Sequence, residues 1–135
     1  MNFEESLKQG HVKKIPIDKF RAKNLIKSSE QAIETAKKIL LNENSAKTIL
    51  RELYEGLREC CESIGYIKGY KFLSHEVITY FIEDTLKNEK IAKRFDRYRK
   101  IRNGINYYGE NVDAETVKGA IKEIPELVKE LRDII

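Results

Sequence analysis

Apolar residues recur every three or four positions along most of the chain, and this spacing predicts helices. A first helix is expected to begin at Asp18, and the polar segment 42–44 ends it. A second is expected over 46–67, because Gly69 supplies a C-terminal stop. No alternation of apolar and polar residues predicts a strand anywhere. The first half of the bundle therefore reads as two long helices after a short helix and connector in residues 1–17.

The second half continues in the same way. A third helix is expected after Ser74, with its apolar face reaching Leu86, and a fourth over about 90–108. The fifth begins after Asp113, and its apolar spacing continues across Pro125, so one kinked helix is predicted rather than two. The predicted fold is all-α: a single domain, 1–135, forming an up-and-down antiparallel bundle of four main helices with short extra helices.

Composition excludes several classes of protein. No apolar run approaches the ~18 residues of a membrane span, and the polar, acidic N-terminus is not typical of a secretory signal. Cys60 and Cys61 are adjacent, and with two distant histidines they give no zinc-binding spacing. We therefore expect a cytoplasmic protein with no metal and no cofactor. The net charge of +4 is too small to indicate a nucleic-acid binder unless it is clustered.

Positive charge is concentrated in the fourth predicted helix, in the stretch RYRKIRNGINYYGEN of residues 97–111. On a helix the apolar stripe is Ile91, Phe95, Tyr98, Ile101 or Arg102, Ile105 and Tyr108. Most of the basic side chains, namely Lys90, Lys93, Arg94, Arg97 and Lys100, lie off that stripe. They form either an ordinary solvated face or a strip that contacts phosphate. The aromatic residues of the stripe predict that the protein forms a homodimer.

Arg102 differs because it lies at the edge of the apolar stripe. Helical spacing gathers Arg99, Arg102, Asn103, Asn106 and Tyr107 into one polar cluster beside it. A guanidinium in such a place needs a partner, since burying it alone is costly. Arg102 is either paired with a carboxylate or carbonyls between helices, or it is part of a preformed anion site, because its fork matches phosphate oxygens.

These motifs resemble the HEPN family of small cytoplasmic helical proteins of bacteria and archaea. In RNGINYY, Arg102 and Asn103 match the family's arginine and polar residue, and Tyr107 stands where one common version has histidine. The stretch 53–82, with its Lys-Gly turn and Ser-His-Glu step, is also similar. The resemblance covers roughly residues 18–135.

The resemblance implies a bundle that dimerises with its signature helices facing each other. It also implies a nucleotide- or RNA-binding module, in some members paired with a minimal nucleotidyltransferase in toxin–antitoxin fashion. Members with arginine and histidine are often metal-independent ribonucleases. On that basis the candidate catalytic residues are Arg102, Asn103 and Tyr107, and the candidate ligand-binding residues add Arg99 and Asn106.

The absent histidine decides between the alternatives. Neutral tyrosine is a poor proton acceptor at pH 7, so Tyr107 favours a binding module over an enzyme. A ribonuclease that uses Arg102 to stabilise charge on the phosphate is the alternative. A helical scaffold without a ligand is the second alternative. His75 at the start of a helix is expected to bond locally, and it gains interest only if the fold brings it to Arg102.

Overall fold

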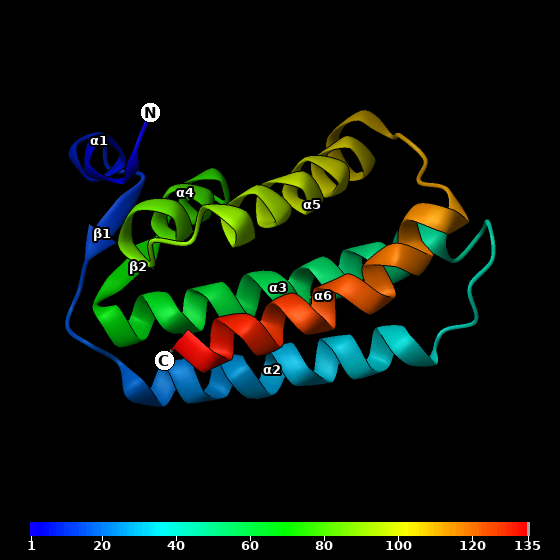
Figure 1. The fold of residues 1–135 in the computed structure, drawn as a ribbon, viewed down its shortest axis with the longest axis horizontal. Coiled ribbons are helices and arrows are strands. Elements are labelled where there is room, and N and C mark those ends of the chain that lie inside the picture. The colour runs from blue at the N-terminus through cyan, green and yellow to red at the C-terminus, as the bar shows by residue number, and fades with distance from the viewer. Residues whose placement is uncertain (135) are drawn as a thin grey trace.

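Four long helices form the body of the protein in a computed structural model, which describes residues 1–134 (Figure 1). They are α2 (Lys19–Lys38), α3 (Ala46–Lys68), α5 (Glu89–Tyr108) and α6 (Ala114–Ile134). Successive long helices run in opposite directions, and α5 lies across α3 from α2 (Figure 1). The predicted all-α, up-and-down bundle with short extra helices is confirmed.

Helices α2 and α3 pack closely because small residues meet at their interface. The Ser29 hydroxyl donates to the Gly56 carbonyl over 2.6 Å. A β-carbon at Gly56 would lie 2.7 Å from Ile33 Cγ1 and 3.0 Å from the Ser29 carbonyl oxygen. Only glycine therefore permits this separation of the two helices. At its start α2 is capped by the Asp18 carboxylate, which accepts the Arg21 backbone N–H.

Helix α6 is continuous across Pro125, as its apolar spacing predicts. Its apolar residues before and after the proline are buried together and pack into the core around α3: Val117, Ile124, Val128 and Leu131. Burial of this continuous apolar face stabilises the helix by more than it loses through the one backbone hydrogen bond that proline cannot donate. The prediction of one helix in this region is confirmed.

The structure contains a small sheet that the sequence pattern did not predict. Strand β1 (Val12–Lys14) pairs antiparallel with β2 (Tyr70–Phe72), so that Val12 faces Phe72. Gly69, with φ of 86°, turns the chain from α3 into β2. Three-residue strands are too short to show a period of two, and their pairing depends on a tertiary contact. The sheet attaches the N-terminal segment, including α1 (Phe3–Lys8), to the body of the protein.

The third predicted helix is divided in the structure. It comprises α4 (Glu76–Tyr80) and a π-helical turn, η1 (Phe81–Thr85), which carries Phe81 and Ile82 into the core. Beyond it Lys87 adopts a left-handed conformation, with φ of 55°. Asn88 then caps α5 by accepting the Ile91 backbone N–H. This connection sets the direction in which α5 crosses the bundle.

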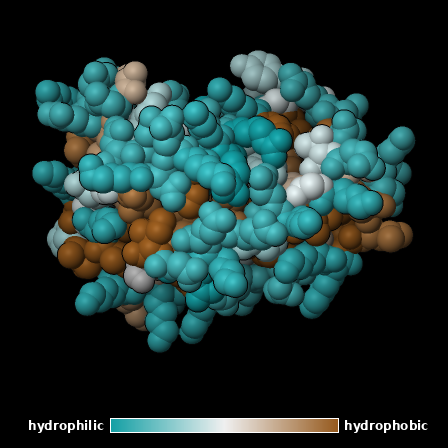
Figure 2. Space-filling model, in the orientation of Figure 1, coloured by the Kyte–Doolittle hydropathy of each residue, from teal (hydrophilic) through white to brown (hydrophobic). Residues whose placement is uncertain are grey.

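The surface on the side shown in Figure 2 is largely hydrophilic, with apolar groups visible between the helices. None of the helices in residues 1–134 has an apolar stretch long enough to cross a lipid bilayer.

Candidate functional site

Helix α5 carries the candidate residues and ends at Gly109, as predicted, with φ of 64° at that glycine. Most of its predicted apolar stripe is buried within the protomer: Ile91, Phe95, Tyr98 and Ile105. Phe95 is fully buried and packs against Tyr54 of α3, with ring centres 5.8 Å apart. Tyr108, by contrast, is 78% exposed, so its assignment to the buried stripe was wrong.

The aromatic stripe was the basis for predicting a homodimer, and the structure removes most of that basis. Phe95 and Tyr98 belong to the core of one protomer and present no surface to a second. Tyr107 and Tyr108, which are 68% and 78% exposed, are the aromatic residues of α5 that reach the surface. A dimer contact through α5 would therefore use the end of the helix.

The basic residues in the first half of α5 are mostly paired with carboxylates. Arg94 lies 3.6 Å from Glu130 of α6, and Arg97 donates to Glu123 over 2.9 Å. Lys93 pairs with Glu89, and Lys100 with Asp96, at 3.2 and 3.1 Å. Lys90 is exposed, and no ion pair to it is present in residues 1–134. Arg94 was expected on a solvated face, but α6 partly covers it.

Arg99, a predicted ligand-binding residue, is committed to a neighbouring carboxylate. Its guanidinium lies 2.7 Å from Asp96, whose carboxylate also accepts the Thr79 hydroxyl from α4. Burial alone would raise the pKa of Asp96, but the hydrogen bonds from Arg99, Lys100 and Thr79 outweigh it and lower the pKa. The structure thus places Arg99 in a network that ties α5 to α4.

Arg102 is surrounded by neutral groups. Its Nη1 donates to the Asn103 side-chain oxygen at 3.3 Å and to the Tyr107 hydroxyl at 3.4 Å. The guanidinium carbon lies 5.6 Å from the centre of the Tyr54 ring and 5.6 Å from that of Tyr107. No carboxylate in residues 1–134 lies within ion-pair distance of it. Of the alternatives left open by the sequence, pairing of Arg102 with a carboxylate is therefore not observed in residues 1–134.

The fold brings His75 to the same place. Its Nδ1 lies 3.0 Å from the hydroxyl of Tyr54, and the two rings are 5.7 Å apart between centres. Burial, together with the charges of Arg58 and Arg102, lowers the pKa of His75 to about 4, so the imidazole is neutral at pH 7. Burial also raises the pKa of Tyr54, which keeps the phenol protonated. The expectation that His75 bonds only locally was wrong.

Arg58, one turn after Tyr54 on α3, is an arginine whose charge is fully paired, in contrast to Arg102. Its guanidinium is held between the carboxylates of Glu55 and Glu62 on the same helix. Burial would lower its pKa, but these carboxylates raise it. Arg58 therefore adds positive potential near His75, while its own charge is already paired with two carboxylates.

We use the name Arg102 cluster for Tyr54, His75, Arg102, Asn103 and Tyr107. Sequence spacing identified the three residues from α5 but not Tyr54 or His75, which come from α3 and from the start of α4. The Asn106 side chain is exposed and makes no hydrogen bond within residues 1–134. The signal for His75 was its position in the Ser-His-Glu step, but only the tertiary fold shows that His75 and Arg102 both lie next to Tyr54.

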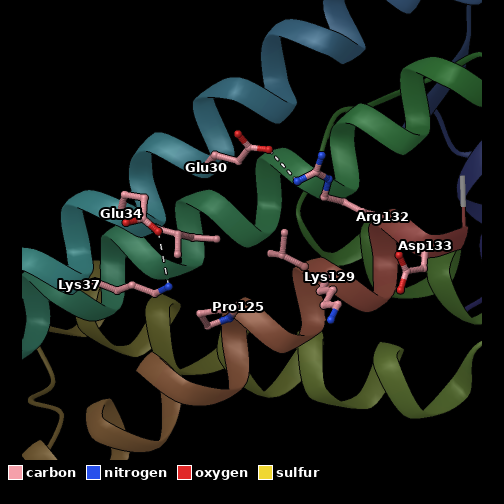
Figure 3. Close-up of a pocket in the computed structure, with 9 residues that line it drawn as sticks. Glu30, Glu34, Lys37, Pro125, Lys129, Arg132 and Asp133 are labelled. Atoms are coloured by element: carbon pink, nitrogen blue, oxygen red, sulfur yellow. Dashed lines mark hydrogen bonds and ion pairs between the residues drawn. The ribbon is translucent and has the colours of Figure 1, made fainter.

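A groove of about 400 Å³ lies elsewhere, between α2 and α6 (Figure 3). Two ion pairs occupy part of its charged rim: Arg132 donates to Glu30 over 2.7 Å, and Lys37 lies 3.5 Å from Glu34. Pro125 and Val128 form part of its apolar wall. Because its arginine is already paired with a carboxylate, this groove is a weaker candidate for an anionic ligand than the Arg102 cluster.

Comparison with known proteins gives no match: no family model fits the chain, and neither a curated protein nor a solved structure is significantly similar to it. The resemblance to the HEPN family consequently remains a hypothesis that rests on the motifs themselves.

Proposed function

We propose that the protein is a HEPN-like module that binds a phosphate-bearing ligand, a nucleotide or RNA, at the Arg102 cluster. The observation that carries this proposal is the state of Arg102. On α5 the guanidinium groups of Arg94, Arg97 and Arg99 each face a carboxylate, whereas that of Arg102 faces only neutral side chains. An arginine fork without a carboxylate partner retains donors for phosphate oxygens.

The surroundings of Arg102 suit a nucleotide. Tyr107 is largely exposed and lies next to the guanidinium, and the following residue of α5, Tyr108, is also exposed. Exposed aromatic rings next to a cation stack on bases, while the cation holds the backbone. The binding surface is then the C-terminal end of α5 together with the adjoining part of α3.

The homodimer remains part of this proposal, now through the exposed end of α5. A nucleotidyltransferase partner is a further proposal that the HEPN resemblance suggests. Tyr107 and Tyr108 are the support for a contact here, because exposed aromatic side chains favour interfaces. Light scattering at tens of micromolar tests the dimer, and a monomer throughout would leave a binding module that acts alone.

Comparing two arginines of one helix tests the proposed binding. We expect Arg102→Ala to weaken binding of a fluorescent decauridylate about tenfold or more, since hydrogen bonds to charged groups contribute about 1.5–3 kcal/mol. Arg97→Ala removes the same charge from an exposed, Glu123-paired position and should cost about twofold or less. Equal losses for both variants would show that the helix acts only as diffuse positive charge.

A metal-independent endoribonuclease is the second candidate, and the imidazole of His75 beside Arg102 is the observation that favours it. Incubating the protein with RNA in EDTA tests this directly. We expect no cleavage by the unchanged protein, and a gain of cleavage in Tyr107→His that is lost again when Arg102→Ala is added. Efficient cleavage by the unchanged protein, abolished by Arg102→Ala, would make the enzyme the better description.

A further inference from the structure

We infer that His75 is a binding residue of the Arg102 cluster: Tyr54 holds its imidazole in one tautomer, so that Nε2–H donates to the phosphate-bearing ligand. This rests on the proposed function and adds the residue that would complete its site. It also assigns His75 the role of a neutral donor instead of a proton acceptor.

The hydroxyl of Tyr54 fixes the tautomer. Tyr54 is 0% exposed, and His75 Nδ1 is the hydrogen-bond partner of its hydroxyl within residues 1–134. A buried O–H that does not donate loses the hydrogen bond it made to water, which is unfavourable. Tyr54 therefore donates, Nδ1 accepts, and the single proton of the neutral imidazole is on Nε2. The donor that remains points away from Tyr54.

In the ligand-free protein, burial and the surrounding charges favour a neutral imidazole at His75. Arg58 on α3 and Arg99 and Arg102 on α5 disfavour a further positive charge, and Glu55 on α3 only partly offsets them. A protonated histidine would repel these arginines, whereas a neutral N–H donor adds a hydrogen bond without repulsion. The site thus combines a positive potential with a charged hydrogen-bond donor, Arg102, and a neutral one, His75.

The two donors share one platform, the ring of Tyr54. The Arg102 guanidinium lies 5.6 Å from its centre and the His75 ring 5.7 Å. Arg102 is also one of the charges that lower the pKa of His75, so one extended ligand could contact both groups. With Tyr107 and Tyr108 exposed for bases, the ligand class that fits best is a single-stranded oligonucleotide.

The tautomer also has a chemical consequence. A proton on Nε2 leaves no lone pair there, and Nδ1 is occupied by Tyr54. Neither nitrogen is therefore available to remove a proton from a ribose 2′-hydroxyl. His75 in this state holds a phosphate without promoting cleavage.

Binding measurements with three substitutions of His75 test the inference. The probe is fluorescent decauridylate, with unlabelled ATP as a competitor to separate RNA from nucleotide binding. We expect His75→Ala and His75→Asn each to weaken binding about tenfold, because neither side chain places a donor where Nε2–H is. His75→Gln, whose amide reaches the Nε2 position, should stay within about threefold of the unchanged protein.

The tautomer is measured separately, by long-range proton–nitrogen NMR on a His11→Gln variant, in which His75 is the remaining histidine. A proton on Nε2 at pH 7 is expected; a proton on Nδ1, or a mixture, would overturn the donor role. This measurement needs no substitution at position 75, so it tests the donor role of His75 even if His75→Ala does not fold.

The outcomes separate the two proposals. If all His75 variants bind like the unchanged protein while Arg102→Ala loses affinity, His75 is not a binding residue and the proposed function stands. If the unchanged protein binds neither probe, both proposals are wrong.

Discussion

The two halves of α5 contain similar residue types, but their side chains have different environments. From Lys93 to Lys100 the cations face carboxylates of α5 and α6, and the aromatic side chains enter the core. From Arg102 to Tyr108 the cation faces neutral groups, and the aromatic side chains at 107 and 108 reach solvent. The same residue types stabilise the fold in one half and remain available to a ligand in the other.

What separates the halves is the supply of carboxylates. Asp96 and Glu89 lie on the first two turns of α5, and Glu123 and Glu130 of α6 face the same half. The region around Arg102 receives Tyr54 and His75 instead. An arginine-rich helix is thus not uniformly a binding surface, and pairing must be examined residue by residue.

The largest expected difference between the halves concerns stability. Phe95→Ala should lower the free energy of unfolding by about 3–5 kcal/mol, because it leaves a cavity beside Tyr54. Tyr108→Ala removes an exposed ring and should change it by less than about 0.5 kcal/mol. Urea unfolding followed by circular dichroism measures both, and similar losses would mean that the end of α5 is also part of the core.

The second difference concerns the pH dependence of stability. The folded pKa of His75 lies below its ordinary value, so between about pH 6.5 and pH 4 the unfolded chain binds a proton that the folded protein does not. This contribution to stability is complete above about pH 6.5 and is lost as the pH falls. Between pH 7 and pH 5 the unchanged protein should lose about 1–2 kcal/mol more than His75→Gln does.

Arginine variants refine that measurement. Arg102→Ala should raise the pKa of His75, because it removes one of the positive charges that lower it. Arg97→Ala should leave the NMR titration of His75 unchanged, since Arg97 pairs with Glu123. Equal shifts in both variants would contradict a specific electrostatic effect of Arg102 on His75.

The smallest expected effect comes from making the first half resemble the second. Asp96→Asn releases Arg99 and Lys100 and should raise affinity for decauridylate about threefold, with a steeper dependence on salt. Asp133→Asn makes the same charge change at the exposed end of α6 and serves as the control. An identical gain in both variants would mean that only net charge had changed.

Much of this fold was accessible from sequence because helical periodicity is local. The long helices, the start of α2 at Asp18 and the stop at Gly69 all follow from residues close to one another in the chain. The π-helical turn and the β1–β2 pair could not be predicted in this way, since both depend on contacts between distant segments. Tertiary contacts decide what periodicity leaves open.

The site was predictable only in part for the same reason. Arg102, Asn103 and Tyr107 share one helix, so their proximity follows from spacing alone. That Arg99 would bind Asp96, three residues away, was equally local and was overlooked. The approach of Tyr54 and His75 depends on how α3, α4 and α5 pack, which no single segment encodes.

The close contact at Gly56 bears on the order of folding. Helices α2 and α3 are neighbours in sequence, and their interface, with Ser29 bonded to Gly56, closes a short loop. Local contacts of this kind form early, whereas the docking of α5 requires a longer chain segment to be ordered. We expect α2 and α3 to show the slowest amide hydrogen exchange and α5 to open more readily. The Arg102 cluster would then exist only in the last species to form, and partly folded chains would be unable to bind the ligand.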